Sequence, residues 1–294
     1  MERALASYHP IISFLFFFIV ICMTMLYMHP VLIGISFMGA LIYSIILNKE
    51  KTIQTLKFAI TMVLVVTVAN GLFVHRGVTV LCFINSNPIT LESIFYGFTS
   101  GSMMASIIMW FSCYNEIITS DKFLYIFGKT LPSVALIVSM TLRLIPKFIN
   151  QTKIIANSQK TVGLDHSEGS IKMKAKSSMR ILSILVTWSL EDAVQTADSM
   201  KARGYGLKGR TNFSIYKFIE RDMIMLLVMG LAGLFLFMGY LNGYGNLRFY
   251  PTIQKIRFDG IYIFVYIAFL IITILPSFLE LVEAYKWKYS EWMD

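Results

Sequence analysis

The chain has 294 residues, of which 56% are hydrophobic and 15% are charged, and its mean hydropathy is +0.65. Soluble domains have about 25% charged residues, so this composition excludes a soluble protein and favours a polytopic membrane protein. The net charge of +9 is concentrated between Arg143 and Arg221, where fourteen basic and six acidic residues stand. The positive-inside rule predicts that this block lies in the cytoplasm.

Six apolar segments have roughly the length, about 20 residues, that crosses the hydrocarbon core of a bilayer. In chain order they are 11–28, 31–47, 56–74, 91–113, 223–241 and 260–281. A further apolar stretch, 131–142, is too short to span alone, so we expect it to lead into the charged block or to dip into the membrane. The sequence thus predicts an all-α fold with N-terminal membrane helices (1–116, about four spans), a cytosolic helical arm (117–218) and C-terminal membrane helices (219–294, about two spans).

The orientation in the membrane follows from the loops. Lys49, Lys51 and Lys57 predict that the second loop is cytoplasmic, which puts the arm and both termini on the cytoplasmic side. Arg248, Lys255 and Arg257 stand in a loop that this arrangement places outside, but the larger basic block outweighs them.

The fourth apolar segment contains Gly97 and Gly101, followed by Ser102 and Ala105. Small residues four positions apart allow helix backbones to approach closely in lipid. Internal packing is the favoured interpretation, and a contact surface for a partner subunit is the alternative.

Two amphipathic helices are predicted within the arm. The first runs over about 133–162, and Pro146 is expected to kink it because proline removes a backbone donor. The second runs over about 171–202, and its apolar stripe narrows to Ser189, Ala193 and Ala197. A stripe of small residues predicts that the two helices cross closely and pack there.

The second arm helix ends in Ala202-Arg203-Gly204. Glycine after a helix end adopts the left-handed conformation without steric cost, and a cation there is favoured by the helix dipole. One interpretation is therefore an ordinary helix cap, and the other is a binding tip at the end of a long cytosolic helix. The residues 204–211 match the spacing of a phosphate-binding loop, but Arg210 replaces its lysine and a polar helix precedes it, which excludes a nucleotide site.

The remaining polar residues do not form a recognisable site. The three cysteines and four histidines are scattered without metal-ligand or disulfide spacing. The basic block shows no basic groove with interleaved aromatic residues of the kind that binds nucleic acid, and juxtamembrane lysines are explained by topology and anionic lipid. We therefore expect no catalytic residue, no cofactor, no metal and no nucleic acid.

Residue-level resemblance to a known family is confined to about 131–206. Arg143-Leu144-Ile145-Pro146 is similar to the Arg-Phe-Ile-Pro element of the transmembrane (T) component of energy-coupling factor (ECF) transporters, the EcfT/CbiQ type. The stretch 190–205, which contains Ala202-Arg203-Gly204, resembles the stretch that leads into the second Ala-Arg-Gly signature of that family. At the position of the first signature the chain has Thr161-Val162-Gly163. There the glycine and the following Leu164-Asp165 fit, whereas the alanine and arginine are missing.

The resemblance implies a non-catalytic scaffold of a vitamin or transition-metal importer in a prokaryotic cell membrane. Its arm would dock on two cytosolic ABC-type ATPase subunits through the two signatures, and its membrane helices would hold a small substrate-binding subunit within the lipid bilayer. The missing arginine departs from the symmetric pattern of the family, and it fits either a heterodimeric ATPase pair with unlike grooves or a divergent branch of the family. The alternatives are a conventional ABC permease subunit, which couples through one short helix, a membrane-embedded enzyme, and a scaffold without ATPases.

Overall fold

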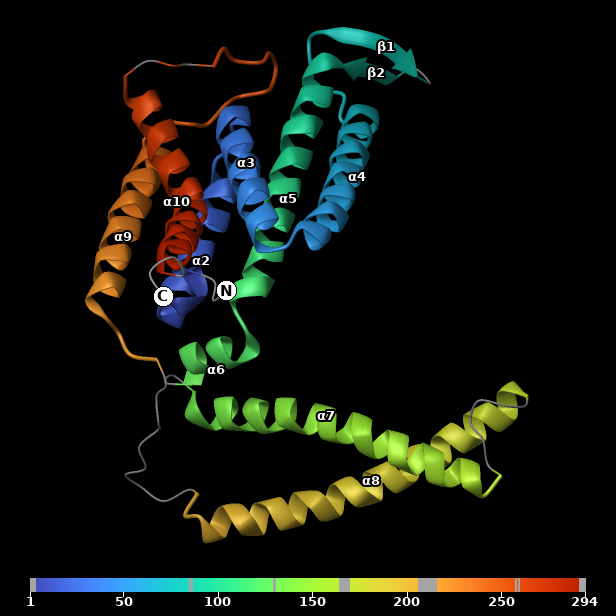
Figure 1. Cartoon of the computed structure of the whole chain (residues 1–294). Helices are drawn as coiled ribbons and strands as arrows, with labels where there is room; N and C mark the ends of the chain where they lie inside the picture. The colour runs from blue at the N-terminus through green and yellow to red at the C-terminus, as the bar shows by residue number, and fades with distance from the viewer. Residues whose placement is uncertain are drawn as a thin grey trace. The chain divides into compact units, whose positions relative to one another are not determined.

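The computed structural model describes residues 4–84, 87–128, 131–163, 170–205, 216–256, 258 and 260–290. Nearly all of its regular structure is helical (Figure 1). The helices are α1 (Ala4–Ser7), α2 (Pro10–Leu26), α3 (Pro30–Leu47), α4 (Lys49–Phe73), α5 (Leu91–Ile117), α6 (Ser120–Gly128), α7 (Pro132–Thr161), α8 (Ile171–Ala202), α9 (Glu220–Leu241) and α10 (Ile261–Ser290). Two short strands, β1 (Val80–Ile84) and β2 (Asn87–Thr90), form an antiparallel hairpin.

Six of the described helices are long and apolar enough to cross a membrane, namely α3, α4, α5, α7, α9 and α10. The all-α, polytopic membrane fold predicted from the sequence is therefore confirmed. In detail the set differs, because α2 occupies the predicted first span with only 17 residues. The helix α7 qualifies by composition because the apolar stretch 131–142 continues without a break into the amphipathic segment that follows it.

The chain divides into two compact units, Met1–Phe123 with Tyr216–Asp294 and Leu124–Ile215. The first unit contains the helices α2, α3, α4, α5, α9 and α10, and the second contains α7 and α8. The second unit falls within the part of the chain that the sequence assigns to the arm.

An aromatic cluster around Trp110 of α5 forms the core of the first unit. Trp110 is fully buried, and its ring lies edge-on to Phe16 and Phe17 of α2, with centroid distances of 5.8 and 6.2 Å. Its indole nitrogen donates a hydrogen bond to Ser36 Oγ of α3 at 3.0 Å. Buried tryptophan combines a large apolar surface with one polar group that needs a partner, so this arrangement fixes α2, α3 and α5 against one another.

The two glutamates of α5 stand at its ends, and both are held by polar partners. Glu92 is only 2% exposed, and its carboxylate accepts hydrogen bonds from the backbone nitrogen of Thr79 at 3.1 Å and from its hydroxyl at 2.8 Å. These bonds tie the loop before β1 to the start of α5. At the other end Glu116 forms an ion pair of 2.7 Å with Lys51 of α4.

The hairpin of β1 and β2 was missed by the sequence prediction, which had only a loop between the third and fourth apolar segments.

Candidate functional site

The two long helices of the second unit are joined by a small set of polar and aromatic contacts. Lys147 Nζ of α7 lies 2.5 Å from Asp192 Oδ1 of α8. The same ammonium group lies 5.3 Å from the centre of the Trp188 ring, and Phe148 packs edge-on against that ring at 5.8 Å. A cation over an aromatic face and an edge-to-face aromatic pair are both favourable geometries. We call these four residues the Lys147 clasp.

The packed face of α8 differs from the stripe that the sequence predicts. Ser189 is half-buried, but Ala193 and Ala197 are exposed, so the close crossing expected through these small residues is absent. Several larger or polar side chains of α8 are buried or half-buried as well, among them Ile181, Leu185, Trp188 and Asp192. Trp188, which contacts Phe148 and Lys147 of α7, supplies the largest of these side chains.

On α7 the element that resembles the family motif lies just before the clasp. Arg143 and Pro146 are both exposed, and the helix continues through Pro146. Proline cannot donate a backbone hydrogen bond and leaves the carbonyl of Leu142 without its usual partner, so this turn is weaker than the rest of α7. The deformable turn thus stands directly before Lys147, where α7 is fastened to α8.

The two helices end in glycine turns that match in their described residues. At the end of α8, Gly204 has φ of +75°, its nitrogen donates to Lys201 O at 3.0 Å, and Tyr205 N donates to Met200 O at 3.1 Å. This pair of hydrogen bonds is the Schellman motif. At the end of α7, Gly163 has φ of +79° and its nitrogen donates to Lys160 O at 3.0 Å.

The residues that precede these glycines are equivalent in backbone and unlike in chemistry. Val162 has φ of −89° and ψ of 8°, and Arg203 has φ of −84° and ψ of 3°. Both are exposed, Val162 with 73% of its surface accessible. Arg203 forms no ion pair within the part of the chain that the structure describes. One helix therefore presents an apolar side chain at its tip where the other presents a free cation.

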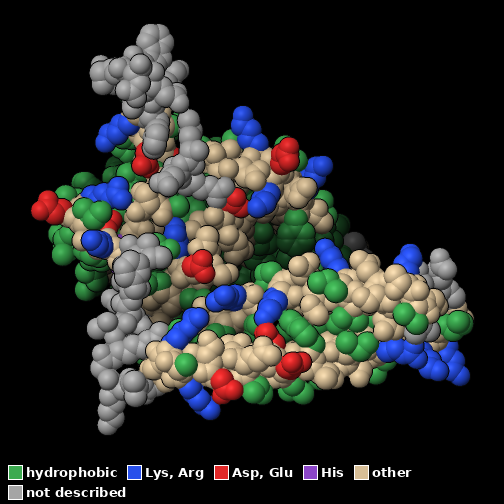
Figure 2. Space-filling model, turned by 60° about the horizontal axis from the view of Figure 1, so that its bottom comes forward, with side chains coloured by type: hydrophobic (Ala, Val, Ile, Leu, Met, Phe, Trp, Pro, Cys, Tyr) green, Lys and Arg blue, Asp and Glu red, His purple; other side chains and the backbone are tan. Residues whose placement is uncertain are grey.

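The described residues include both three-residue signatures and stop at or directly after the glycine of each. Leu164 and Asp165, which fit the first family signature, and residues 206–211 of the phosphate-loop match lie outside the described residues. Thr161 and Ala202 are the last helical residues of α7 and α8, so each three-residue signature begins on a helix and ends at its glycine. Figure 2 shows basic, acidic and hydrophobic side chains together on the surface of these helices.

In the first unit, Gly97 and Gly101 of α5 face α4 of the same chain. A Cβ atom on Gly97 would lie 2.8 Å from Asn70 Cβ, and one on Gly101 would lie 3.0 Å from Val63 Cα. Real Cβ atoms essentially never come closer than 3.0 Å, so the glycines permit this backbone approach. The space beside them is taken by α4, which is the internal packing that the sequence analysis favours over a contact with another subunit.

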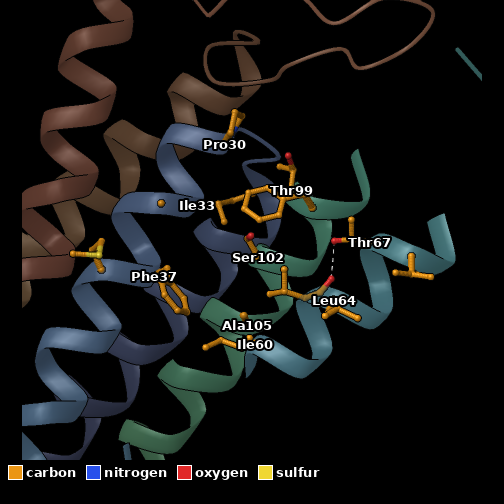
Figure 3. Close-up of a pocket in the computed structure, with 14 residues that line it drawn as sticks. Pro30, Ile33, Phe37, Ile60, Leu64, Thr67, Thr99, Ser102 and Ala105 are labelled. Carbon is orange, nitrogen blue, oxygen red and sulfur yellow. Dashed lines mark hydrogen bonds between the residues drawn. The ribbon is translucent and has the colours of Figure 1, made fainter. Parts of the chain in front are cut away.

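An apolar groove of about 680 Å³ lies between α3, α4 and α5 (Figure 3). Ile33 and Phe37 come from α3, Ile60 and Leu64 from α4, and the smaller Ser102 of α5 lies between the two sides. The hydroxyl of Thr67, which could make the groove polar, donates to Val63 O in its own helix at 2.7 Å. In a bilayer such a groove is filled by lipid chains or by a neighbouring helix. Among the described residues no group of three or more His, Cys, Asp or Glu could hold a metal ion.

Comparison with known families shows to which of them this chain belongs. The family described as "CbiQ: Cobalt transport protein" matches residues 2–215, which is most of the chain. The chain belongs to the CbiQ family. Residues 2–215 include both long helices and their glycine ends, so the match covers the region in which the sequence motifs stand.

Curated relatives of this CbiQ-family chain carry the name of an ECF transporter subunit. The "Energy-coupling factor transporter transmembrane protein EcfT" of Lactobacillus helveticus is 34% identical over 119 residues, 39% of this chain and 43% of the relative. Those of Streptococcus thermophilus and Listeria monocytogenes (there named EcfT 1) are 36% identical over 117 residues and 37% identical over 97 residues, covering 44% and 36% of each relative. The matched part spans less than half the length of these relatives. The resemblance to the T component of ECF transporters is thereby confirmed.

Sequence reasoning missed the residues that hold the two helices together. Lys147 and Asp192 stand 45 positions apart, and nothing in their spacing indicates that they meet. The aromatic pair Phe148 and Trp188 gives the stronger signal, since large aromatic residues on a mostly polar helix need a surface to pack against.

Proposed function

We propose that the chain is the scaffold subunit of an ATP-driven ECF-type importer and hydrolyses nothing itself. One observation carries the proposal. Two long helices of this family member end at a glycine with positive φ that follows an exposed cap residue, Val162 or Arg203, and these ends stand at the positions that resemble the two family signatures. An exposed helix end with a defined backbone offers a partner a fixed shape, which favours docking over a purely structural cap.

The partners in this proposal are two cytosolic ABC-type ATPase subunits. Thr161-Val162-Gly163 would meet one of them and Ala202-Arg203-Gly204 the other. Arg203 suits a groove that carries acidic side chains, because a cation and a carboxylate form a charge-assisted hydrogen bond. Val162 suits an apolar groove, because it has no charge to pair. The proposal therefore includes two unequal contacts, and it favours an ATPase pair whose two grooves differ.

Movement would pass from the ATPases through α7 and α8, with Arg143 and Pro146 on the segment that leads into the arm. A separate small membrane subunit would bind the substrate and rest against the membrane helices. A vitamin or a transition-metal ion is the proposed cargo. In the membrane, the proposed arrangement has residues 117–218 and both termini in the cytoplasm, with 1–116 and 219–294 forming the two membrane parts.

Purification of the chain with and without its partners tests the proposal. The chain alone should hydrolyse no ATP, and it should retain neither cobalt(II) nor riboflavin nor folate on a desalting column. Co-expression with an ABC-type ATPase pair encoded beside it should yield a stable complex that hydrolyses ATP. Failure of the ATPases to co-purify, or substrate uptake by the chain alone in liposomes, would refute the scaffold function.

A further inference from the structure

The short helix α1 has an unusual set of hydrogen bonds. Its four carbonyl oxygens each accept one from a side chain. Ala4 O accepts from Ser7 Oγ and Leu5 O from Ser13 Oγ, both at 2.8 Å. Ala6 O accepts from Lys122 Nζ at 2.8 Å, and Ser7 O accepts from Arg221 Nη2 at 3.1 Å. The last carbonyls of a helix have no partners within it and carry partial negative charge, so two cations are well placed there.

In the sequence, one of the two cations precedes the arm helices and the other follows them. Lys122 stands on α6 directly before the second unit, which begins at Leu124, and Arg221 stands on α9 shortly after that unit ends at Ile215. They bind the carbonyls of two consecutive residues, Ala6 and Ser7. Residues separated by the whole arm are thus brought to one point through α1.

Each side of this point is reinforced. Lys122 is only 7% exposed, its burial lowers the pKa of its ammonium group, and it also donates to Ile117 O of α5 at 3.3 Å. The guanidinium of Arg221 lies 5.0 Å from the centre of the Tyr8 ring. On a third side, Glu280 of α10 accepts a hydrogen bond from Ala4 N at 3.0 Å. A buried charge is retained only where its bonds compensate the loss of water, so Lys122 is committed to these carbonyls.

The chain that leaves the arm is held in the same way. The ring of Phe218 packs edge-on against His9 at 5.4 Å. Asp222 is 1% exposed and accepts from Ile219 N at 3.1 Å, which fixes the first turn of α9 beside Arg221. Residues 4–9 therefore contact both the segment that leads into the arm and the segment that leads out of it.

We propose that α1 is a brace that fixes the two roots of the arm to each other, with Lys122 and Arg221 as its positioning residues. The inference rests on the coupling role proposed above, because a fixed base matters for an arm that transmits motion. With its roots held together, displacement at the tips of α7 and α8 moves the base as one body. Without the brace, the same displacement separates the roots and is lost.

Spin labels on the roots test the brace directly. Cysteines replacing the exposed Asp121 and Lys217 are labelled in a chain whose native cysteines have been replaced, and the distance distribution between the labels is measured in liposomes. We expect one narrow distribution. Lys122→Met or Arg221→Met should add a second, wider population, because removal of a charge-assisted hydrogen bond raises the open fraction by roughly tenfold or more. The exposed Lys57→Met is the matched control and should change nothing.

Conservative variants separate positioning from folding. Lys122→Arg and Arg221→Lys keep a cation at each carbonyl and should restore the single narrow distribution. A distribution that stays narrow in both methionine variants would overturn the brace. Circular dichroism and membrane insertion identify a variant that has simply unfolded. If replacement of the native cysteines causes the unfolding, the methionine variants are compared in the cysteine-intact chain by the amide exchange of residues 8–13.

A second experiment uses the complex with the ATPases, trapped with ATP and vanadate. In the unmodified brace the root-to-root distance should be the same with and without trapping, and in Lys122→Met it should increase on trapping. A trapped distance that is unchanged in the variant would overturn the role of the brace in coupling. If no ATPase binds, the scaffold function itself fails, whereas the distances in the chain alone still report whether α1 holds the roots.

Discussion

Removal of the charge on Lys147 is expected to loosen the crossing of α7 and α8 more than its surface position suggests. The ammonium group has two partners on α8, the carboxylate of Asp192 at 2.5 Å and the face of Trp188 at 5.3 Å. The Lys147 side chain is 49% exposed and that of Asp192 is 18% exposed. The Asp192 carboxylate is thus the less exposed of the two groups, and its charge depends more on Lys147 for stabilisation.

The magnitude follows from these exposures. An exposed ion pair contributes about 0.2–1 kcal/mol, and the shielding of Asp192 favours the upper part of that range. A cation over an exposed aromatic ring adds about 0.5–1 kcal/mol. Lys147→Met removes both, so it should lower the free energy of local opening by about 1–2 kcal/mol. Asp192→Asn removes only the ion pair and should cost about 0.5–1 kcal/mol.

Amide hydrogen exchange of the intact chain measures this local opening, because exchange in α7 and α8 reports the separation of the helices without global unfolding. A double-mutant cycle of Lys147→Met and Asp192→Asn isolates the pair from the ring contact. Lys153→Met, at another exposed lysine of α7, is the matched control. Raising the salt concentration should reduce the coupling energy, since screening weakens partly exposed charges.

Two results would show that the reasoning is wrong. A coupling energy near zero at low salt would mean that the ion pair is incidental to the crossing. Faster exchange spread equally over the helices of the first unit would mean that the clasp does not act on α7 and α8 in particular.

Three further predictions concern the signatures, the glycine contact and the topology. Arg203→Ala should reduce recovery of the ATPases, since an acidic partner left unpaired at a buried interface costs about 2–5 kcal/mol, whereas Val162→Ala should have a small effect; equal recovery of both complexes would leave Arg203 as a helix cap only. Gly101→Ala should lower the melting temperature of the purified chain because its Cβ would meet the backbone of α4, and Gly34→Ala, which has nothing within 4 Å, should be tolerated; similar melting of the two variants would rule out the close contact. A cysteine at Ser177 should be protected from an impermeant thiol reagent in intact cells, and labelling from outside would reverse the orientation.

The limits of the two long helices could be predicted from the sequence almost to the residue. The prediction of 133–162 and 171–202 compares with Pro132–Thr161 and Ile171–Ala202. Gly163 and Gly204 explain this success, because a residue with φ near +75° to +79° ends a helix through local sterics alone. Apolar length predicted the membrane helices for a similar reason, since the thickness of the bilayer sets it.

What the sequence could not predict depends on contacts between distant residues. The stripe of Ser189, Ala193 and Ala197 suggests a close crossing, but the side-chain contacts to α7 come from Trp188 and Asp192. The binding of α1 carbonyls by Lys122 and Arg221 joins positions more than a hundred residues apart. Every residue has a backbone carbonyl, so no residue type in the sequence indicates which carbonyls accept these bonds. In the hairpin, five strand-forming residues are too few to distinguish from a loop.

The difference between Val162 and Arg203 also bears on how an assembly chooses its arrangement. If the chain has the scaffold function proposed above, two unlike ATPases could be placed on it in two ways, related by exchanging their positions. Because the glycine turns have matching backbones, shape alone would not tell the two ways apart. The burial of a cation in an apolar pocket is costly, so the exchanged arrangement would carry a penalty that the correct one avoids. One exposed side chain, Arg203, is then enough to determine which ATPase binds at which of the two helix ends.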